Sequence, residues 1–259
     1  MRRPSRFIIL FVTLWLAAGE GTPAGTAMTT EPSRPLEQGR QLYQRACLWC
    51  HGAGGQGDGP AGWNIGRFSS PRPRDFTGES FKFRSTPSGD LPSDEDLFRT
   101  LTRGIPGVMP SFRALSEDAR WSLVEYVKSL NPDFARATRT PMKLSPPPIG
   151  PSEHSLANGR QIFRSFGCPA CHGSQGQGDG PESVQGHLYD SRRLPIHATD
   201  LTARSSLKNG ARARDLYRSI MTGLDGTPMP SYADQFVDRE ADAWDLVWYL
   251  LSMSGEQER

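Results

Sequence analysis

The four cysteines of the sequence form two pairs, and a histidine follows each pair directly: Cys47-Leu-Trp-Cys50-His51 and Cys168-Pro-Ala-Cys171-His172. Two thiols with two residues between them lie on one turn of chain, where they can bond covalently to the two vinyl groups of a porphyrin. The adjacent imidazole is then held beneath the iron. This arrangement predicts two covalently bound heme c groups, in which the cysteines attach the porphyrins and the histidines coordinate the iron.

Other uses of paired cysteines explain less of the pattern. An exported protein with an even number of cysteines commonly forms disulfides, and this is the simplest alternative. A redox-active Cys-x-x-Cys pair does not need the histidine, and a zinc site needs further thiols or histidines near by. Heme attachment gives both cysteines and the histidine of each motif a role.

A sixth ligand for each iron is expected from methionine. The first half of the chain contains a single histidine, His51, so two histidines cannot coordinate the iron there. Met109 follows in a proline-bordered loop, whereas Met142 lies in a proline-rich segment. Met229 follows His172 at nearly the same spacing and in the same Met-Pro-Ser-aromatic context. We therefore expect Met109 and Met229 to be the second axial ligands.

The other methionines and histidines of the second half have simpler interpretations. Met221 and Met253 fall within helical patterns and are expected to fill the core. His154, His187 and His197 are expected to be solvated loop residues rather than ligands.

The motifs belong to an internal repeat, which predicts two homologous domains. Matching segments occur in the same order in both halves: Gly39-Arg-Gln-Leu-Tyr43 with Gly159-Arg-Gln-Ile-Phe163, Gly55-Gln-Gly-Asp-Gly-Pro60 with Gly176-Gln-Gly-Asp-Gly-Pro181, and Met109-Pro-Ser-Phe112 with Met229-Pro-Ser-Tyr232. We place the first domain at residues 28–135 and the second at 152–259. The proline-rich residues 136–151 between them are expected to form an extended spacer.

Helical periodicity predicts an all-α fold. The expected helices are one that leads into Cys47, one that Ser93 caps and Gly104 ends, one that Ser116 caps, and one that carries Trp244, Val247, Trp248 and Leu251. No segment shows a strong alternating strand pattern. The Gly- and Pro-rich stretches between the helices are long for a compact domain, and wrapping a heme would explain them.

The first 27 residues resemble an export signal. Arg2, Arg3 and Arg6 precede an apolar run from Phe7 to Ala18, which is shorter than the roughly 20 residues of a membrane-spanning helix. We expect a periplasmic or otherwise exported protein with no membrane span in the mature chain. An uncleaved N-terminal anchor is the alternative.

The charge balance excludes some partners. The formal net charge is +2, and removal of the first 27 residues brings it to zero, so nothing favours nucleic acid or an anionic membrane surface. Residues 28–150, which include the proline-rich segment, have an excess of basic residues, and residues 151–259 have an excess of acidic ones. This difference predicts separate docking faces for an electron donor and an electron acceptor.

On these motifs, the sequence resembles the class I cytochromes c in a tandem diheme form, over residues 36–130 and 153–253. The resemblance implies that the first and last helices of each domain cross beside the heme. The implied contacts join Gly39 and Tyr43 to the helix of Trp121, and Gly159 and Phe163 to the helix of Trp244. It also suggests Arg74 or Arg84 as a partner of a heme propionate.

Histidine and methionine together would leave no open position on either iron. Such a site favours outer-sphere electron transfer over catalysis, so we expect a carrier or the electron-transfer subunit of a respiratory oxidoreductase. A diheme peroxidase-like enzyme is the alternative, and it would require one heme to become five-coordinate. A third hypothesis is a sensor in which a diatomic ligand displaces methionine.

Overall fold

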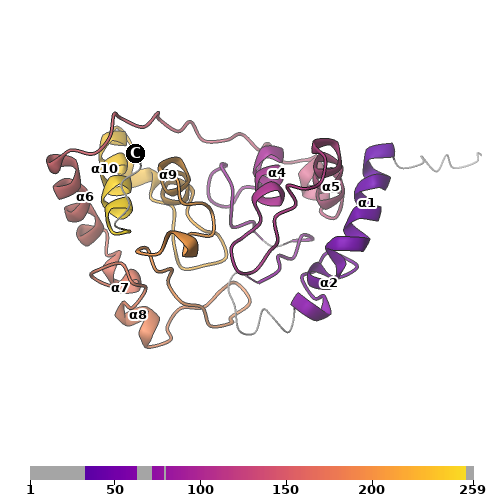
Figure 1. Cartoon of the computed structure of the whole chain (residues 1–259), viewed down its shortest axis with the longest axis horizontal. Helices are drawn as coiled ribbons and strands as arrows, with labels where there is room; N and C mark the ends of the chain where they lie inside the picture. Colours follow the sequence, from indigo (N-terminus) through magenta and orange to yellow (C-terminus); the bar gives the residue numbers. More distant parts are fainter. Residues whose placement is uncertain (1–32, 63–71, 79, 255–259) are drawn as a thin grey trace, which may run out of the picture. The chain divides into compact units, whose positions relative to one another are not determined.

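The structure is a computed structural model that describes residues 33–62, 72–78 and 80–254. The expected export signal at residues 1–27 lies outside the described residues. Pro32–Arg259 form one compact unit, and both halves of the repeat fold within it (Figure 1). Throughout the described residues the regular elements are helices, with isolated β-bridges and no strand. The predicted all-α fold is therefore confirmed.

Four helices of the first half have counterparts in the second half. The first half consists of α1 (Arg34–Ala46), α2 (Leu48–His51), α4 (Asp94–Arg103), α5 (Glu117–Ser129) and the short 3-10 helix η1 (Pro132–Ala135). The second half consists of α6 (Glu153–Ser165), α7 (Pro169–His172), α8 (Pro181–Val184), η2 (Arg204–Ser206), α9 (Ala213–Thr222), η3 (Ala233–Phe236) and α10 (Glu240–Ser252). The helices α1, α2, α4 and α5 correspond in order to α6, α7, α9 and α10. In each half a one-turn helix carries the second cysteine and the histidine of the motif.

The predicted helix ends in the first half are confirmed by the capping contacts. The hydroxyl of Ser93 accepts a hydrogen bond from the Asp96 N–H at 3.2 Å, and the Asp96 carboxylate accepts one from the Ser93 N–H at 3.2 Å. Ser116 caps α5 through the Ala119 N–H at 3.2 Å. Gly104 follows α4 with a φ of 67°, which glycine adopts without strain.

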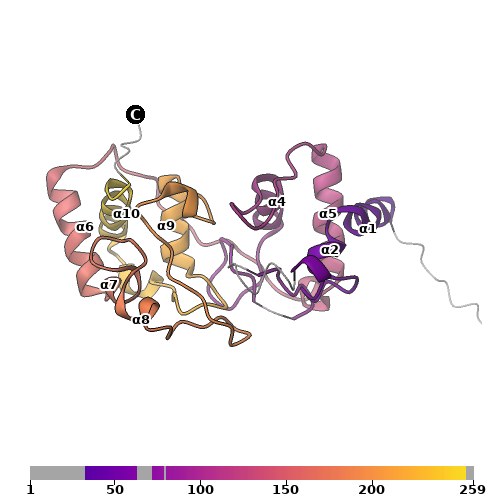
Figure 2. The ribbon, with the colours of Figure 1, turned by 60° about the horizontal axis from the view of Figure 1, so that its bottom comes forward.

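The first and last helices of each half cross at a glycine, as the family resemblance implied. A Cβ atom at Gly39 would lie 1.9 Å from the carbonyl oxygen of Ser122, and one at Gly159 would lie 2.1 Å from that of Asp245. Only glycine permits these approaches. Figure 2 shows α1 beside α5 and α6 beside α10. The crossings fix the helices that lead into the two cysteine motifs.

The core consists of two hydrophobic clusters, one in each half. The main members of the first are Tyr43, Leu97, Leu101, Leu123, Val124 and Phe134, and those of the second are Phe163, Leu216, Tyr217, Phe236, Trp244 and Val247. Each cluster includes a residue of the first helix and residues of the last helix. Two separate cores agree with two domains.

The linker does more than separate the domains, so its interpretation as a spacer was wrong. Leu144 packs against the second core, and Ser145 accepts a hydrogen bond from the indole nitrogen of Trp244 at 2.9 Å. The N–H of Met142 donates to the carbonyl oxygen of Ser85 at 2.8 Å. The sequence missed these contacts because proline content indicates an extended backbone but not what the intervening side chains touch.

A search of the described helices for a segment long and apolar enough to cross a membrane finds none.

Candidate functional site

A cavity of ≈ 150 Å³ in the first half brings together the residues that the sequence singles out there. Cys47, Cys50 and His51 line it from the end of α1 and from α2, and Met109 lines it from the loop after α4. The rest of the wall is mainly apolar and includes Phe76, Phe81, Leu97, Leu101, Phe112 and Val127. All four predicted site residues of this half therefore share one cavity.

The second half contains the corresponding cavity, with a volume of ≈ 220 Å³. Cys168 lines it from the residue before α7, Cys171 and His172 line it from the end of α7, and Met229 lines it from the loop after α9. The repeat therefore extends from the motifs to the cavities that they line.

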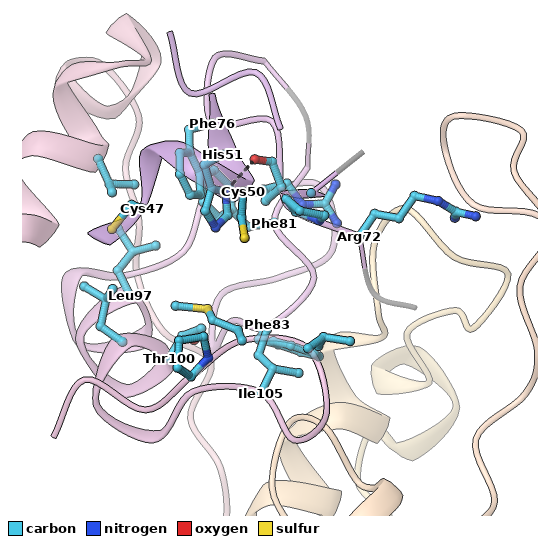
Figure 3. Close-up of a pocket in the computed structure, with 18 of the residues that line it drawn as sticks. Cys47, Cys50, His51, Arg72, Phe76, Phe81, Phe83, Leu97, Thr100 and Ile105 are labelled. Carbon is cyan, nitrogen blue, oxygen red and sulfur yellow. Dashed lines mark hydrogen bonds between the residues drawn. The ribbon is translucent and has the colours of Figure 1, made fainter. Parts of the chain in front are cut away.

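In the first cavity, the histidine and the methionine loop come from opposite walls. Figure 3 shows His51 and Cys50 on one side and Leu97, Thr100 and Ile105 across the cavity from them. Ile105 pairs with Met109 through two backbone hydrogen bonds of 2.9 Å. A planar group held by the cysteines between these walls would meet an imidazole on one face and a thioether on the other.

Backbone carbonyl groups orient both histidines. The Nδ1 atom of His51 lies 3.2 Å from the carbonyl oxygen of Arg74, and the Nδ1 of His172 lies 2.9 Å from that of Thr199. A carbonyl oxygen only accepts hydrogen bonds, so Nδ1 carries the hydrogen and Nε2 keeps the lone pair that a metal needs. Burial lowers the pKa of both imidazoles, which favours this neutral form.

The two carbonyl groups belong to a repeated segment that the sequence interpretation missed. Phe76 donates its N–H to the Gly55 carbonyl at 2.7 Å, and Leu201 donates to that of Gly176 at 2.6 Å. Phe76 also stacks on His51, with ring centroids 4.4 Å apart. The sequence signal is the match of Arg74-Asp75-Phe76-Thr77 with Thr199-Asp200-Leu201-Thr202. The match spans only four residues and lies among loop residues that differ between the two halves, so it stands out little in the sequence.

The four cysteines are free, so the alternative of two disulfides is wrong. Burial raises the pKa of Cys47 and of Cys168 to about 11. Both groups are therefore neutral thiols near physiological pH. Covalent addition to a porphyrin vinyl group requires free thiols of this kind. In the described residues, no group of three or more His, Cys, Asp or Glu side chains could hold a metal ion.

Basic side chains lie at the part of the cavity walls where the two cavities approach each other. Lys82 and Phe83 line both cavities, Arg72 and Arg74 line the first, and Lys208 lines the second. The Nε atom of Arg72 is buried without a hydrogen-bond partner. Burial, with the nearby Arg74 cation adding to it, lowers the pKa of Lys82 to about 8. Half-buried cations of this kind fit the carboxylates of heme propionates.

The two arginines suggested for the propionates therefore differ. Arg74 lines the first cavity. Arg84 is not among the lining residues of either cavity; its side chain is fully buried and contacts Thr222 and Asp225 instead. The sequence could not distinguish them, because both lie in the same loop-rich segment.

The predictions for the spare histidines and methionines hold in most respects. Met221 is buried in the second core, and Met253 packs against it. His154, His187 and His197 are exposed. His154 lies in the first turn of α6 rather than in a loop, and His197 also contributes to the wall of the second cavity.

Comparisons with known proteins agree with this geometry. The family model described as cytochrome c oxidase, cbb3-type, subunit III matches residues 34–127, and the cytochrome c family model matches residues 156–254. A chain of the reducing HAO-like protein complex of Kuenenia stuttgartiensis is similar in structure, with a TM-score of 0.76 and 36% sequence identity. The match covers 84% of this chain and 96% of that one. This chain belongs to the cytochrome c family. No curated protein matches it at a significant level.

As a cytochrome c with two such domains, the protein is expected to hold covalently bound heme c. The residues present fit this group in three ways. Each cavity offers paired free thiols, a histidine with an available Nε2, and a largely apolar wall with basic side chains at one side. Heme binding for electron transfer is therefore the general function of the fold.

Proposed function

We propose that this protein is an exported diheme c-type cytochrome. It passes electrons between redox partners by outer-sphere transfer, either as a carrier or as the electron-transfer subunit of a respiratory oxidoreductase. The observation that carries the proposal is that each cavity joins a Cys-x-x-Cys-His motif to a methionine on a separate loop. One heme in each cavity accounts for all eight of these side chains.

Each residue type has a distinct role in the proposed sites. Cys47 and Cys50 attach the first heme and Cys168 and Cys171 the second, which keeps the cofactor bound in both oxidation states. His51 with Met109, and His172 with Met229, would coordinate the two heme irons. When bound, heme iron supplies one-electron chemistry by alternating between its ferric and ferrous states, and methionine ligation raises its reduction potential.

The apolar walls support electron transfer rather than catalysis. They exclude water from the iron and limit the reorganisation that accompanies a change of charge. With a methionine in each cavity, neither iron has a position reserved for substrate. A peroxidase-like activity would need one of these methionines to leave.

The partner and the location follow from similarity and from the N-terminal pattern. The similar chain belongs to the reducing HAO-like protein complex of Kuenenia stuttgartiensis, so a redox enzyme of that kind is the partner that we propose. The basic and apolar pattern of residues 1–27 supports export, and the periplasm is the compartment in which we expect the two proteins to meet.

Heme content and coordination test the proposal directly. The protein would be produced in a host that attaches heme c, and its heme would be measured as the pyridine complex. We expect two hemes per chain, both low-spin and six-coordinate in the ferric and ferrous states, and reduction without peroxide turnover. Fewer than two hemes would overturn the diheme assignment. A high-spin heme together with rapid peroxide turnover would replace the carrier by an enzyme.

A further inference from the structure

The loops that carry Met109 and Met229, residues 104–109 and 223–229, are called the methionine loops. Different hydrogen bonds join the two ends of each loop. In the first domain, Ile105 and Met109 exchange two backbone hydrogen bonds of 2.9 Å, one in each direction. This loop therefore closes on itself. The pairing with Ile105 holds Met109 at the end of a short loop directly after α4.

The loop of the second domain is one residue longer between its leading glycine and its methionine. Leu224 donates its N–H to the Met229 carbonyl at 3.1 Å, but the Met229 N–H donates to the Thr227 hydroxyl at 3.3 Å instead of returning to Leu224. The reciprocal pair of the first domain is thus replaced by one backbone bond and one side-chain bond. Asp225 lies in this looser loop.

Asp225 binds the other domain. One of its carboxylate oxygens lies 2.7 Å from the guanidinium of Arg84. The same carboxylate accepts hydrogen bonds from the Ser88 hydroxyl and the Gly89 N–H, both at 2.8 Å. Three groups of a single first-domain loop therefore hold one side chain of the second-domain methionine loop.

Arg84 also binds the end of the helix that precedes the loop. Its Nη2 donates to the carbonyl oxygen of Thr222, the last residue of α9, at 2.6 Å. A cation at this position satisfies a carbonyl group that the helix leaves free and interacts favourably with the helix dipole. Arg84 thus contacts the segment between α9 and Met229 at its start and, through Asp225, in its middle.

The guanidinium is fixed from its own side as well. Arg84 donates from Nε to the Pro87 carbonyl and from Nη1 to the Phe81 carbonyl, each at 3.0 Å. Its side chain has no exposed surface, and that of Asp225 is 12% exposed. Removal of one member of a buried, hydrogen-bonded charge pair costs more than loss of a surface ion pair, because the remaining charge stays desolvated.

We propose that Arg84 is a positioning residue for the methionine loop of the second heme, so that the first domain holds the second domain's axial ligand in place. The proposal rests on the proposed function, in which Met229 coordinates that iron. It implies that the two hemes are not independent modules: the sixth ligand of the second heme depends on an arginine from the first domain, whereas that of the first heme depends on its own loop.

Competition by an added ligand tests the proposal on the diheme protein. Imidazole binds ferric heme only when methionine leaves, so its apparent affinity reports how firmly the loop holds. We expect Arg84→Met to increase the affinity of one heme for imidazole by about tenfold or more, and Asp225→Asn to increase it several-fold. The responding heme is assigned with Met229→Ala, which removes the competing ligand from the second heme alone.

Arg103→Met is the matched control. Arg103 also reaches the second domain, where its guanidinium lies 3.2 Å from the Asp215 carboxylate in the first turn of α9, at the opposite end of this helix from the methionine loop. It is 37% exposed. We expect this variant to bind imidazole as the wild type does. If Arg84→Met does not fold, Asp225→Asn and Arg84→Lys provide the same measurement.

Three outcomes overturn the proposal. In the first, Arg84→Met and Asp225→Asn bind imidazole within twofold of the wild type. In the second, the responding heme is the first one. In the third, Arg103→Met has as large an effect, which would assign the change to domain docking in general. An unchanged spectrum in Met229→Ala would instead remove the ligand assignment on which the proposed function depends.

Discussion

The indole Nε1 of Trp244 donates a hydrogen bond to the Ser145 hydroxyl at 2.9 Å, which connects the linker to the last helix of the second domain. The Tyr217 hydroxyl lies 3.0 Å from the same oxygen, and the Tyr217 ring stacks on Trp244 with centroids 4.3 Å apart. The Ser145 hydroxyl is thus a hydrogen-bond partner of two buried aromatic side chains. The linker is part of the second core.

Ser145→Ala is therefore expected to destabilise the second domain. Trp244 and Tyr217 would lose a common partner, and the free energy of unfolding should fall by about 1–2 kcal/mol. Urea unfolding followed by tryptophan fluorescence measures the change. Ile149→Ser is the control, because Ile149 lies in the same linker and is fully exposed. Equal stability of the two variants would show that the linker contact contributes little.

The helix crossing of the first domain makes a second prediction. Gly39→Ala would place a methyl group 1.9 Å from the Ser122 carbonyl oxygen, which belongs to a helix backbone and cannot move alone. We expect α1 and α5 to separate and the protein to lose about 3 kcal/mol of stability. Thermal unfolding of the heme-loaded protein measures the loss. Gly78→Ala, where a Cβ would meet nothing within 4 Å, should change stability by less than about 0.5 kcal/mol.

The helices could be predicted from sequence because their signals are local. Ser93 and Ser116 mark helix starts through their own side chains, and Gly104 marks an end through its backbone freedom. The cysteine and histidine motifs could be predicted for the same reason, since their spacing within one turn already defines the chemistry. In each case the information lies within a few residues.

The contacts that depend on distant segments could not be predicted. Nothing near Arg84 indicates that it binds Asp225 rather than a propionate, because that outcome depends on how the two domains pack. The role of Ser145 has the same origin. The carbonyl groups that orient the histidines are a different case, since backbone atoms carry no residue-specific signal. Only the short repeated segment around Phe76 and Leu201 could have revealed them.

Heme attachment makes a third prediction. Replacement of Cys47 and Cys50 by serine removes both attachment points of the first cavity and leaves those of the second intact. We expect one covalently bound heme per chain, measured by mass spectrometry and by heme staining after denaturation. The mirror variant, Cys168→Ser with Cys171→Ser, should also retain one. Two hemes in either variant would contradict the assignment.

The methionines make a fourth prediction. Met109→Ala and Met229→Ala should each convert one of the two hemes from methionine ligation to an open or water-bound form, which changes its optical and magnetic spectra and lowers its potential. Met221→Leu is the control, because Met221 is buried in the second core and does not line either cavity. A spectral change in the control as large as that in Met229→Ala would argue against Met229 as the ligand.

The position of Lys82 in the walls of both cavities makes a final prediction, on reduction potential and pH. A positive charge near heme stabilises the reduced iron, which carries one positive charge fewer. Lys82→Met should therefore lower the potentials of both hemes, by on the order of 1 kcal/mol or roughly 40 mV. Lys143→Met, at an exposed linker position, should leave them unchanged.

The pH dependence of the same potentials distinguishes charge from packing. Burial and neighbouring cations lower the pKa of Lys82 to about 8. In the heme-loaded protein a nearby propionate carboxylate raises this pKa and the additional charge of the ferric iron lowers it. The oxidised protein therefore releases the proton at a lower pH than the reduced protein, and the potentials should fall as the pH rises through the pKa of Lys82. Redox titrations between pH 6.5 and 9.5 measure this slope. If Lys82→Met kept the slope of the wild type, another group would be responsible, whereas loss of the slope would assign it to the lysine between the cavities.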